Sequence, residues 1–279
     1  MSDIKKCFTS RWDTGRIVEI DWNQLEVVIL AVESGDMILT QELNEGIDLH
    51  TSMTATVYGQ PYENVMNAIA LGDYEWTKRR KKIKSARFAL QYGAGAKKVA
   101  ETAGWDLEEA KVFINKYYDR YAGIHLWNKL VENEVKRTAK PTGNVVEGFA
   151  EYKGQYISPD GRRYVFTGRQ NKWGGISFPP TKLQNYPIQG LASDFVKMMR
   201  RIILKELYGY TLKPNVLHVN TIHDSIMFDC KTGDDEEFLR KIIKDQYGRA
   251  PWYLSELVHR ERKVEVPLNY SIKSNHYWS

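Results

Sequence analysis

The segment from residue 61 to residue 138 has a helical pattern through almost its whole length, interrupted by single glycines. Strand-like patterns lie on both sides of it in the chain. The run RIVEIDW (16–22) is rich in β-branched residues, and residues 139–180 are dense in Gly, Pro and polar residues, which favours short strands and loops. The sequence therefore predicts a mainly helical middle between segments that contain strands.

Three shorter patterns complete this arrangement. NQLEVVILAVES (23–34) predicts a buried helix with Asn23 as its N-cap, and residues 191–209 predict a second helix that ends at a glycine. Further along, VLHVNTIH and SIMFDC flank a His-Asp pair and predict a β-hairpin with Asp224 at its tip. An acidic residue is thus expected at the turn between two strands.

Composition excludes some classes of protein. The chain has 279 residues with 42% hydrophobic content, which is enough for one large domain or two modest ones. Two cysteines without paired spacing exclude a disulfide framework and a cysteine zinc site. The start lacks the apolar core of a signal peptide, and no apolar run approaches the roughly 18 residues of a membrane span. We expect a soluble, cytoplasmic protein without a membrane partner. Its net charge of +5 is compatible with a polyanionic binding partner.

Two acids stand at the ends of predicted strands. Asp21 closes the strand at 16–22, and Asp224 lies at the hairpin turn. Each alone is explained by the ordinary use of Asp in caps and turns. Together they indicate a pair of carboxylates on rigid sheet elements, which is what binding two hard divalent cations about 4 Å apart requires.

A basic run, KRRKKIKSARFALQYGAG, contains a regular stripe. Arg80, Lys84, Phe88 and Tyr92 follow one another at four-residue steps, so on a helix they form two cations and then two aromatic rings along one side. A nucleoside triphosphate needs cations for its phosphates and flat surfaces for its sugar and base. The alternative interpretation is an amphipathic helix that buries Phe88 and Tyr92 and leaves its cations in water.

Six segments, in chain order, carry an arrangement of residues shared with one known family. They are EIDWNQLEVVILAVESGD around Asp21, DLHTSMTATVYG (48–59), RKKIKSARFALQYG with the stripe just described, NYPIQGLASDFVK (185–197), TIHDSIMF around Asp224, and the last stretch VPLNYSIKSNHYW. They resemble, in turn, motif A (D-Y-S-Q-I-E-L-R), the D-I-H-T segment, motif B, the N-x-P-x-Q-G helix, motif C (V-H-D-E) and the C-terminal strand of family A DNA polymerases, the bacterial polymerase I type.

The resemblance implies an α+β fold of the right-hand type, with a palm (an antiparallel sheet with flanking helices) and mainly helical fingers. The expected domains are palm at 1–36, fingers at 37–175 with an insertion at 139–160, and palm again at 176–279. The family's thumb, first palm segment and exonuclease would lie upstream of the matching region. We therefore expect the catalytic portion of a split or truncated polymerase, with a second polypeptide supplying those parts, in the cytoplasm of a bacterium or a phage-infected host.

The resemblance also implies the reaction, which is transfer of deoxynucleotides (dNTPs) to the 3′-hydroxyl of a primer on template DNA by two-metal phosphoryl transfer. Asp21, Asp224 and the backbone carbonyl of Trp22 would hold two Mg²⁺ ions, with Mn²⁺ as a substitute. Lys84 would be a general acid in catalysis.

Further roles follow from the same resemblance. Contacts to the nucleotide are expected from Arg80, Lys84, His50, Phe88, Tyr92, Gln24 and Glu26, the last as a steric gate against a ribose 2′-hydroxyl. Contacts to primer-template DNA are expected from Gln189 and Asn185 in the minor groove and from His223 at the primer end.

The chain departs from the family pattern at several motif positions. Val28 replaces an Arg in motif A, Ser225 replaces the Glu of motif C, and Thr181 replaces an Arg that precedes Asn185 by four positions. Motif B has Arg87 and Ala89 in place of Asn and Gly. Two metal-site carboxylates therefore remain where many relatives have three.

Two other functions stay open from the sequence. A fragment of a single-subunit RNA polymerase would share the carboxylates and the cation-bearing helix, although Glu26 and the aromatic pair favour deoxynucleotides. A non-catalytic DNA-binding or assembly subunit would fit the departures, although the intact Asp21, Arg80, Lys84 and Asp224 favour an enzyme.

Overall fold

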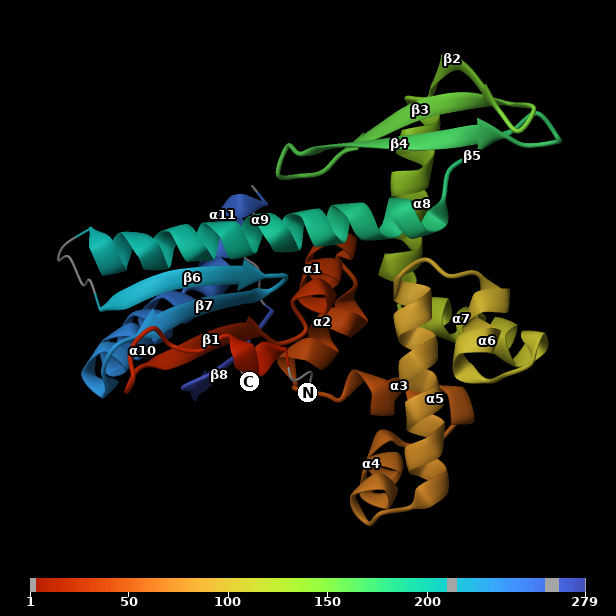
Figure 1. Ribbon diagram of the computed structural model, residues 1–279. Coiled ribbons are helices and arrows are strands. Elements are labelled where there is room, and N and C mark those ends of the chain that lie inside the picture. Colours follow the sequence, from red (N-terminus) through yellow and green to blue (C-terminus); the bar gives the residue numbers. More distant parts are fainter. Residues whose placement is uncertain (1–3, 210–214, 259–265, 279) are drawn as a thin grey trace. The chain divides into compact units, whose positions relative to one another are not determined.

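A computed structural model describes residues 4–209, 215–258 and 266–278 of the chain (Figure 1). The chain forms two compact units, each described by itself below. The sheet unit comprises Met1–Ile29 and Gln189–Ser279, and the helical unit comprises Leu30–Ile188. Both boundaries fall inside helices, α1 (Leu25–Ser34) and α9 (Pro180–Tyr208). The predicted division into palm and fingers stays a prediction.

The sheet unit is built on four antiparallel strands in the order β6-β7-β1-β8. Its elements are the 3-10 helix η1 (Lys5–Cys7), β1 (Arg16–Trp22), β6 (Val216–Ile222), β7 (Ser225–Cys230), α10 (Gly233–Tyr247), α11 (Ala250–Leu257) and β8 (Tyr270–Asn275), together with parts of α1 and α9. The predicted strand at 16–22 and the predicted hairpin are confirmed. β1 lies between β7 and β8, so the motif A strand has a hydrogen-bonded neighbour on each side.

Trp22 anchors the carboxyl end of β1. Its side chain is buried, and its ring stacks on Tyr247 of α10 with centroids 4.1 Å apart. Phe195 of α9 lies 5.3 Å away and Tyr270 of β8 meets the ring edge-on. Aromatic contacts of this kind stabilise beyond the area they bury. The strand end that carries Asp21 is therefore held on a rigid aromatic cluster.

Two predicted helix starts are wrong. α1 begins at Leu25 instead of following an Asn23 cap, because Gln24 has a left-handed backbone (φ 55°) and its carbonyl accepts from Val27 and Val28. α9 begins at Pro180, well before residue 191. A proline at the first helical position loses no hydrogen bond, since that N–H has no partner in any helix. The predicted end before Gly209 is confirmed.

The helical unit contains seven complete helices before its sheet (Figure 1). They are α2 (Met37–Asn44), α3 (Leu49–Tyr58), α4 (Tyr62–Ala70), α5 (Tyr74–Gln91), α6 (Ala96–Ala103), α7 (Leu107–Arg120) and α8 (Ala122–Arg137). Aspartates start four of them, because the side chains of Asp36, Asp48, Asp73 and Asp106 accept hydrogen bonds from first-turn amides. The predicted helical middle of the chain is confirmed.

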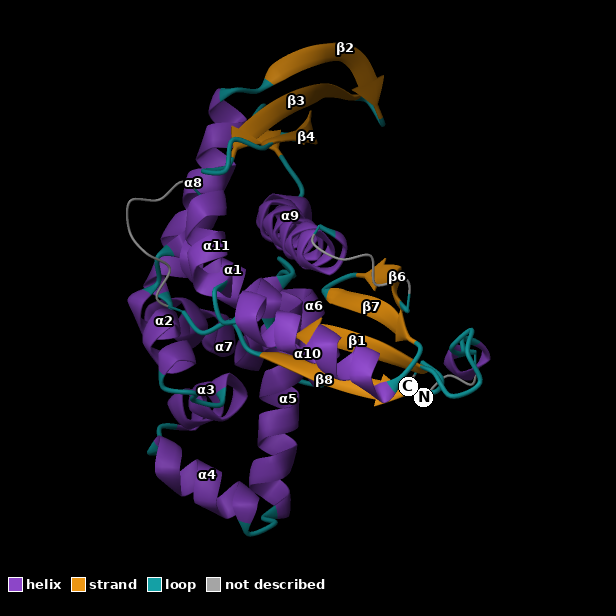
Figure 2. Cartoon of the chain, turned by 90° about the vertical axis from the view of Figure 1, so that its left-hand side faces the viewer, coloured by secondary structure: helices purple, strands orange, loops and turns teal. Residues whose placement is uncertain are grey.

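A second antiparallel sheet follows in the order β2-β3-β4-β5 (orange at the top of Figure 2). Its strands are β2 (Lys140–Val146), β3 (Phe149–Ile157), β4 (Arg163–Gln170) and β5 (Ile176–Ser177). α8 packs so closely on β3 that a Cβ on Gly154 would meet the carbonyl oxygen of Val135. Short strands were predicted here, and the expected insertion at 139–160 lies in β2 and β3. Across the described residues, we find no helix with the length and apolar character to cross a membrane.

Candidate active site

Two strand ends bring Asp21 and Asp224 together in the sheet unit. Asp21 is the next-to-last residue of β1 and lies opposite Ser225, the first residue of β7. Asp224 therefore occupies the turn immediately beside it. The left-handed backbone of His223 (φ 52°) makes that turn tight. The predicted convergence of the two acids is what the register of β1 and β7 produces.

The electrostatics of the pair reflect this proximity. The pKa of Asp21 is raised, first by burial, then by the negative charges of Asp224 and Glu19, and further by a side-chain hydrogen bond to Asp224. Lys273 of β8 acts in the opposite direction, and its Nζ lies 3.9 Å from Glu19 Oε2. The negative charge at this strand end is therefore only partly compensated by the protein.

Such a site fits a hard divalent cation. Oxygen ligands from one or two carboxylates, completed by water and substrate phosphates, are what Mg²⁺ takes in proteins. In the described part of the chain, His, Cys, Asp and Glu form no group of three or more that could hold a metal ion. Ser225 stands next to Asp224 where the family pattern has a third acid, so the side-chain carboxylates at these strand ends are those of Asp21 and Asp224.

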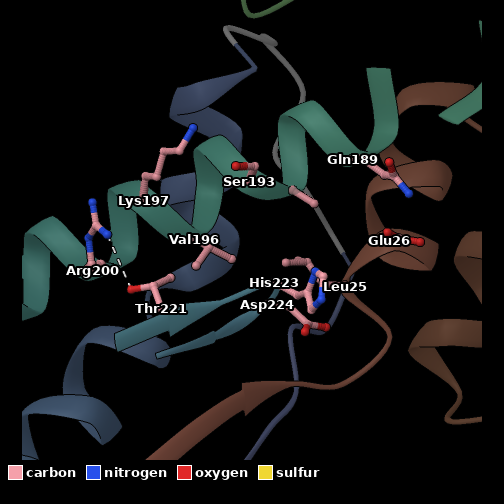
Figure 3. Close-up of a pocket in the computed structure, with 11 residues that line it drawn as sticks. Leu25, Glu26, Gln189, Ser193, Val196, Lys197, Arg200, Thr221, His223 and Asp224 are labelled. Atoms are coloured by element: carbon pink, nitrogen blue, oxygen red, sulfur yellow. Dashed lines mark hydrogen bonds between the residues drawn. The ribbon is translucent and has the colours of Figure 1, made fainter. Parts of the chain in front are cut away.

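A pocket of about 490 Å³ opens beside Asp224 within the sheet unit (Figure 3). Among its lining residues are Glu26 of α1, Gln189, Ser193, Lys197 and Arg200 of α9, and Thr221, His223 and Asp224 of the hairpin. Figure 3 shows Lys197 and Arg200 projecting from α9 on the side of the pocket away from Gln189. The Arg200 guanidinium donates to Thr221 Oγ1 at 3.4 Å, and Lys197 pairs with Asp194 at 3.2 Å. The pocket combines an acidic end with basic side chains.

Sequence reasoning missed the basic part of this pocket. Ser193, Lys197 and Arg200 follow Gln189 by four, eight and eleven positions, so they lie along one side of a helix. That periodicity, continued from the N-x-P-x-Q segment, was the available signal. The basic side of the pocket is a feature of α9 as a whole.

Three of the four residues of the stripe, all within the helical unit, are exposed. Phe88 is 40% exposed, Tyr92 38%, and Lys84 is also exposed, whereas the buried side of α5 consists of Ile83, Ala86, Arg87 and Leu90. The alternative of an amphipathic helix that buries Phe88 and Tyr92 is therefore wrong. Lys84 Nζ stands 5.8 Å from the Phe88 ring centre. A cation and two aromatic faces are thus presented to solvent in sequence.

Arg80, the first residue of the stripe, has protein partners. Its guanidinium donates to Asp48 Oδ2 at 2.5 Å and Oδ1 at 3.3 Å, and to Thr51 Oγ1 at 2.9 Å. Burial opposes ionisation of Asp48, but hydrogen bonds from Arg80 and Thr51 outweigh it and lower the Asp48 pKa to about 2. Arg80 therefore joins α5 to the start of α3 by an ion pair.

His50 of α3 is held next to the stripe. Its Nδ1 is 3.2 Å from Nη1 of Arg87, and because a guanidinium only donates, Nδ1 accepts and the proton lies on Nε2. Burial, then the positive charge of Arg87, lower the pKa of His50 to about 4. The ring lies 5.4 Å from Phe88. At neutral pH His50 is thus an uncharged donor, and Arg87, counted from sequence only as a departure, is buried and orients it.

The end of α5 is fixed by residues of the N-x-P-x-Q segment. Asn185 Nδ2 donates to the carbonyl of Tyr92 at 3.2 Å. Gly93 has φ 76°, and a Cβ there would stand 2.8 Å from the backbone of Thr181. Only glycine satisfies both conditions. Asn185, predicted to contact DNA, thus uses one amide hydrogen for Tyr92 and retains a second.

The predicted site residues fall into two groups, one in each unit. The sheet unit holds Asp21, Trp22, Gln24, Glu26, Gln189, His223 and Asp224, and the helical unit holds His50, Arg80, Lys84, Phe88, Tyr92 and Asn185. Each group is assembled by the packing of its own unit.

Comparison with known proteins places the chain in a family. The sequence pattern described as DNA polymerase family A matches residues 1–279. The chain is 27% identical over 249 residues to DNA polymerase I of Streptococcus pneumoniae (strain ATCC BAA-255 / R6), covering 88% of this chain and 25% of that protein. It is 23% identical over 275 residues to DNA polymerase I of Mycobacterium tuberculosis (strain ATCC 25618 / H37Rv), covering 99% and 26%. The chain thus spans about a quarter of the length of the curated relatives it matches.

A solved structure shares the fold. The POL domain of Pol1 from M. smegmatis, in complex with DNA primer-template and dNTP, aligns with a TM-score of 0.66 and 20% identity over 99% of this chain and 42% of that one. The mixed α+β class is confirmed at this level, whereas the second polypeptide expected from the sequence finds no support in these comparisons. With the family pattern matched from the first residue to the last, the chain belongs to DNA polymerase family A.

Proposed function

We propose that this chain carries out template-directed DNA synthesis, adding deoxynucleotides to a primer 3′-hydroxyl by two-metal phosphoryl transfer. The observation that carries the proposal is the adjacency of Asp21 and Asp224 at the ends of β1 and of the β6–β7 hairpin. Two partly compensated carboxylates, one on β1 and one in the adjoining hairpin turn, are the protein's share of such a reaction. Family membership supports the same reaction.

The metal site would consist of Asp21, Asp224 and the main-chain carbonyl of Trp22. Magnesium bound there would supply activation of the primer hydroxyl and neutralisation of the phosphate charge. The pKa of Asp21 is raised first by burial and then by repulsion from Asp224, the carboxylate that the protein keeps beside it. The buried stack of Trp22 on Tyr247 keeps the strand end from relaxing away from Asp224.

The nucleotide would be held by the exposed stripe of α5. Lys84 has no ion-pair partner within the described residues and is the cation most available to a triphosphate, or as a general acid to the leaving pyrophosphate. His50 would donate from Nε2 as a neutral group. Arg80 would contribute positive charge while remaining bonded to Asp48.

Phe88 and Tyr92 would offer their exposed rings to the sugar and base of the nucleotide. Gln24 would contact the nucleotide from the turn before α1.

DNA contacts would come from α9 and from the turn between β6 and β7. Gln189 and the free amide hydrogen of Asn185 would reach the minor-groove acceptors that all four bases share. His223 would touch the primer end. To these we add Lys197 and Arg200, whose charges on the pocket wall suit backbone phosphates. Phosphate contacts of this kind fix register without selecting sequence.

Primer extension with a matched set of variants tests the proposal. On a primed template with Mg²⁺ and dNTPs, wild type is expected to extend the primer, and Asp224→Asn is expected to lose on the order of 10³-fold in rate, since several kcal/mol of transition-state stabilisation are removed. Asp245→Asn, an exposed residue of α10, is the control with the same change of charge. Extension by Asp224→Asn at the wild-type rate would refute the proposal. Absence of extension by wild type, with DNA binding intact, would favour a non-catalytic subunit.

Sugar selection distinguishes DNA from RNA synthesis. Glu26 lines the pocket beside Asp224, where its side chain would crowd a ribose 2′-hydroxyl. Offered dNTPs and rNTPs side by side, wild type should prefer dNTPs, and Glu26→Ala should weaken that preference by roughly 10². A wild-type preference for rNTPs would instead indicate an RNA polymerase.

A further inference from the structure

The outer face of the β2-β3-β4-β5 sheet is a surface that the proposed reaction does not use. Along β4 the side chains alternate strictly, with Tyr164, Phe166 and Gly168 buried and Arg163, Val165, Thr167 and Arg169 exposed. α8 lies on one side of the sheet, and Figures 1 and 2 show none of the described elements of the helical unit over the other. We call this exposed side the outer face.

Strand register defines which residues share the outer face. Opposite the exposed residues of β4 stand Ile157, Gln155, Lys153 and Glu151 of β3, and Lys140 of β2 stands opposite Lys153. Side chains paired across antiparallel strands point to the same side of a sheet. The outer face therefore carries Lys140, Lys153, Arg163 and Arg169 together.

The charge of the outer face is positive after its internal pairs are counted. Residues 140–177 contain six Lys or Arg and three Asp or Glu. Glu147 is paired with Arg169 at 2.6 Å, and Glu151 accepts from Thr142 and Asn144. Within the described residues, Lys140, Lys153 and Arg163 have no ion-pair partner.

Two of these cations directly oppose each other. Lys140 and Lys153 form a cross-strand pair, and like charges in that position destabilise a sheet. An anion bound between them would remove that cost. Glu151 offsets part of the charge of Lys153, and the net positive charge that remains on the outer face favours an anionic ligand.

Exposed apolar and aromatic groups accompany the cations. On the outer face Val165 is 53% exposed, Ile157 52% and Phe149 39%. Trp173, at the turn between β4 and β5, is 80% exposed with Lys172 Nζ 4.5 Å from its ring. The turn is ordered, because Asn171 Oδ1 accepts from the amides of Trp173 and Gly175 at 3.0 Å each. The protein therefore presents this indole on a defined turn.

We propose that the outer face, with Trp173 at its edge, binds single-stranded DNA. Proteins that bind single strands without sequence preference combine cations for the backbone with aromatic rings on which bases stack. Duplex DNA would satisfy the cations but offers no unstacked bases to Trp173 and Phe149. The surface lies apart in sequence from all the residues assigned to catalysis, and it gives a function to the segment that the sequence marked as an insertion.

Binding of a 16-nucleotide oligo(dT), followed by fluorescence anisotropy at several salt concentrations, tests the proposal on the full chain. The double variant Lys153→Glu/Arg163→Glu should bind more weakly and with a shallower salt dependence, since each lost phosphate contact lowers the slope by about 0.7 for a single strand. Lys241→Glu/Lys244→Glu on α10 makes the same change in net charge elsewhere and should retain the wild-type slope. Equal slopes in the two double variants would overturn the proposal.

A second variant tests stacking without changing charge. Trp173→Ala should weaken oligo(dT) binding by about 5-fold to 150-fold, the equivalent of 1–3 kcal/mol per stacked base. An equal loss with a blunt duplex of the same length would overturn the single-strand assignment in favour of a backbone-only surface. Because primer, nucleotide and metal are absent from the assay, its result does not depend on whether the chain proves to be a polymerase.

Discussion

Asp21 and Ser225 face each other across β1 and β7, and Asp224 directly precedes Ser225 in the chain. Ser225 is buried, and its hydroxyl donates to the carbonyl of Ile222 at 3.1 Å across the turn. In the family pattern this position carries the second acid of motif C. Here the residue closes the hairpin that presents Asp224.

Replacing Ser225 by alanine should therefore affect stability more than chemistry. Loss of one buried hydroxyl–carbonyl hydrogen bond should lower the free energy of unfolding by about 1 kcal/mol, measured by urea denaturation. Nucleotide incorporation should persist, because the two carboxylates keep their positions. If Ser225→Ala abolished incorporation while leaving the unfolding midpoint unchanged, the hydroxyl would belong to the reaction and this interpretation would be wrong.

The parts of the fold that the sequence predicted are those governed by local pattern. The strand at 16–22 and the hairpin around Asp224 each follow from alternating or β-branched residues bounded by a turn. Once both acids lie at strand ends, the register of neighbouring strands brings them together. Helical periodicity likewise predicted that Lys84 and Phe88 lie on one side of α5, although it left open whether that side is exposed.

The parts that the sequence did not predict depend on contacts distant in the chain. The bond between Asp48 and Arg80 joins residues 32 apart, and that between His50 and Arg87 joins residues 37 apart. Neither bond has a local signature in the sequence. The sequence pattern therefore indicated an unpaired cation at Arg80, whereas the structure has Arg80 in an ion pair with Asp48. The predicted start of α1 was wrong because Gln24 adopts a left-handed conformation that glutamine seldom takes.

The ion pair of Asp48 with Arg80 should make stability sensitive to strong acid. The pKa of Asp48 in the folded chain, about 2, lies below its ordinary value of 3.8. The ion pair's contribution to the free energy of unfolding is therefore fully present above pH 4 and disappears as pH falls toward 2. Asp48→Asn keeps an N-cap for α3 but removes the charge. It should cost about 1 kcal/mol at pH 7, as a partly exposed pair does.

Urea unfolding of wild type and Asp48→Asn from pH 5 to pH 2 measures this effect. The difference in free energy of unfolding between the two proteins should shrink as pH falls below 4 and vanish near pH 2. Arg80→Gln serves as the matched variant that removes the other partner. A difference in the free energy of unfolding that does not change with pH would contradict a contribution from the ionised Asp48 carboxylate.

His50 should destabilise the fold as pH falls through mildly acidic values. Its pKa in the folded chain, about 4, lies below the ordinary 6.5, so between these values the unfolded chain binds a proton that the folded chain excludes. The contribution of neutral His50 to the free energy of unfolding is therefore fully present above pH 6.5 and decreases as pH falls toward 4. His50→Gln, which cannot take up a proton, should lack this loss.

Proton NMR of the His50 ring measures the same property directly. Its resonance should titrate near pH 4 in the folded protein and stay constant between pH 6 and pH 8. Arg87→Gln removes the neighbouring positive charge and should raise the midpoint. A wild-type midpoint at 6.5 would mean that His50 is not held against Arg87 in solution.

If Asp21 and Asp224 share divalent metal ions, the number of ions bound must depend on both carboxylates. Mn²⁺ bound to the complex of the chain with primer-template DNA, a chain-terminated primer and the next dNTP can be counted by electron paramagnetic resonance of the free ion. We expect two Mn²⁺ ions per wild-type complex, fewer in Asp21→Asn and Asp224→Asn, and the wild-type number in Asp245→Asn. Equal occupancy in wild type and both active-site variants would contradict this expectation.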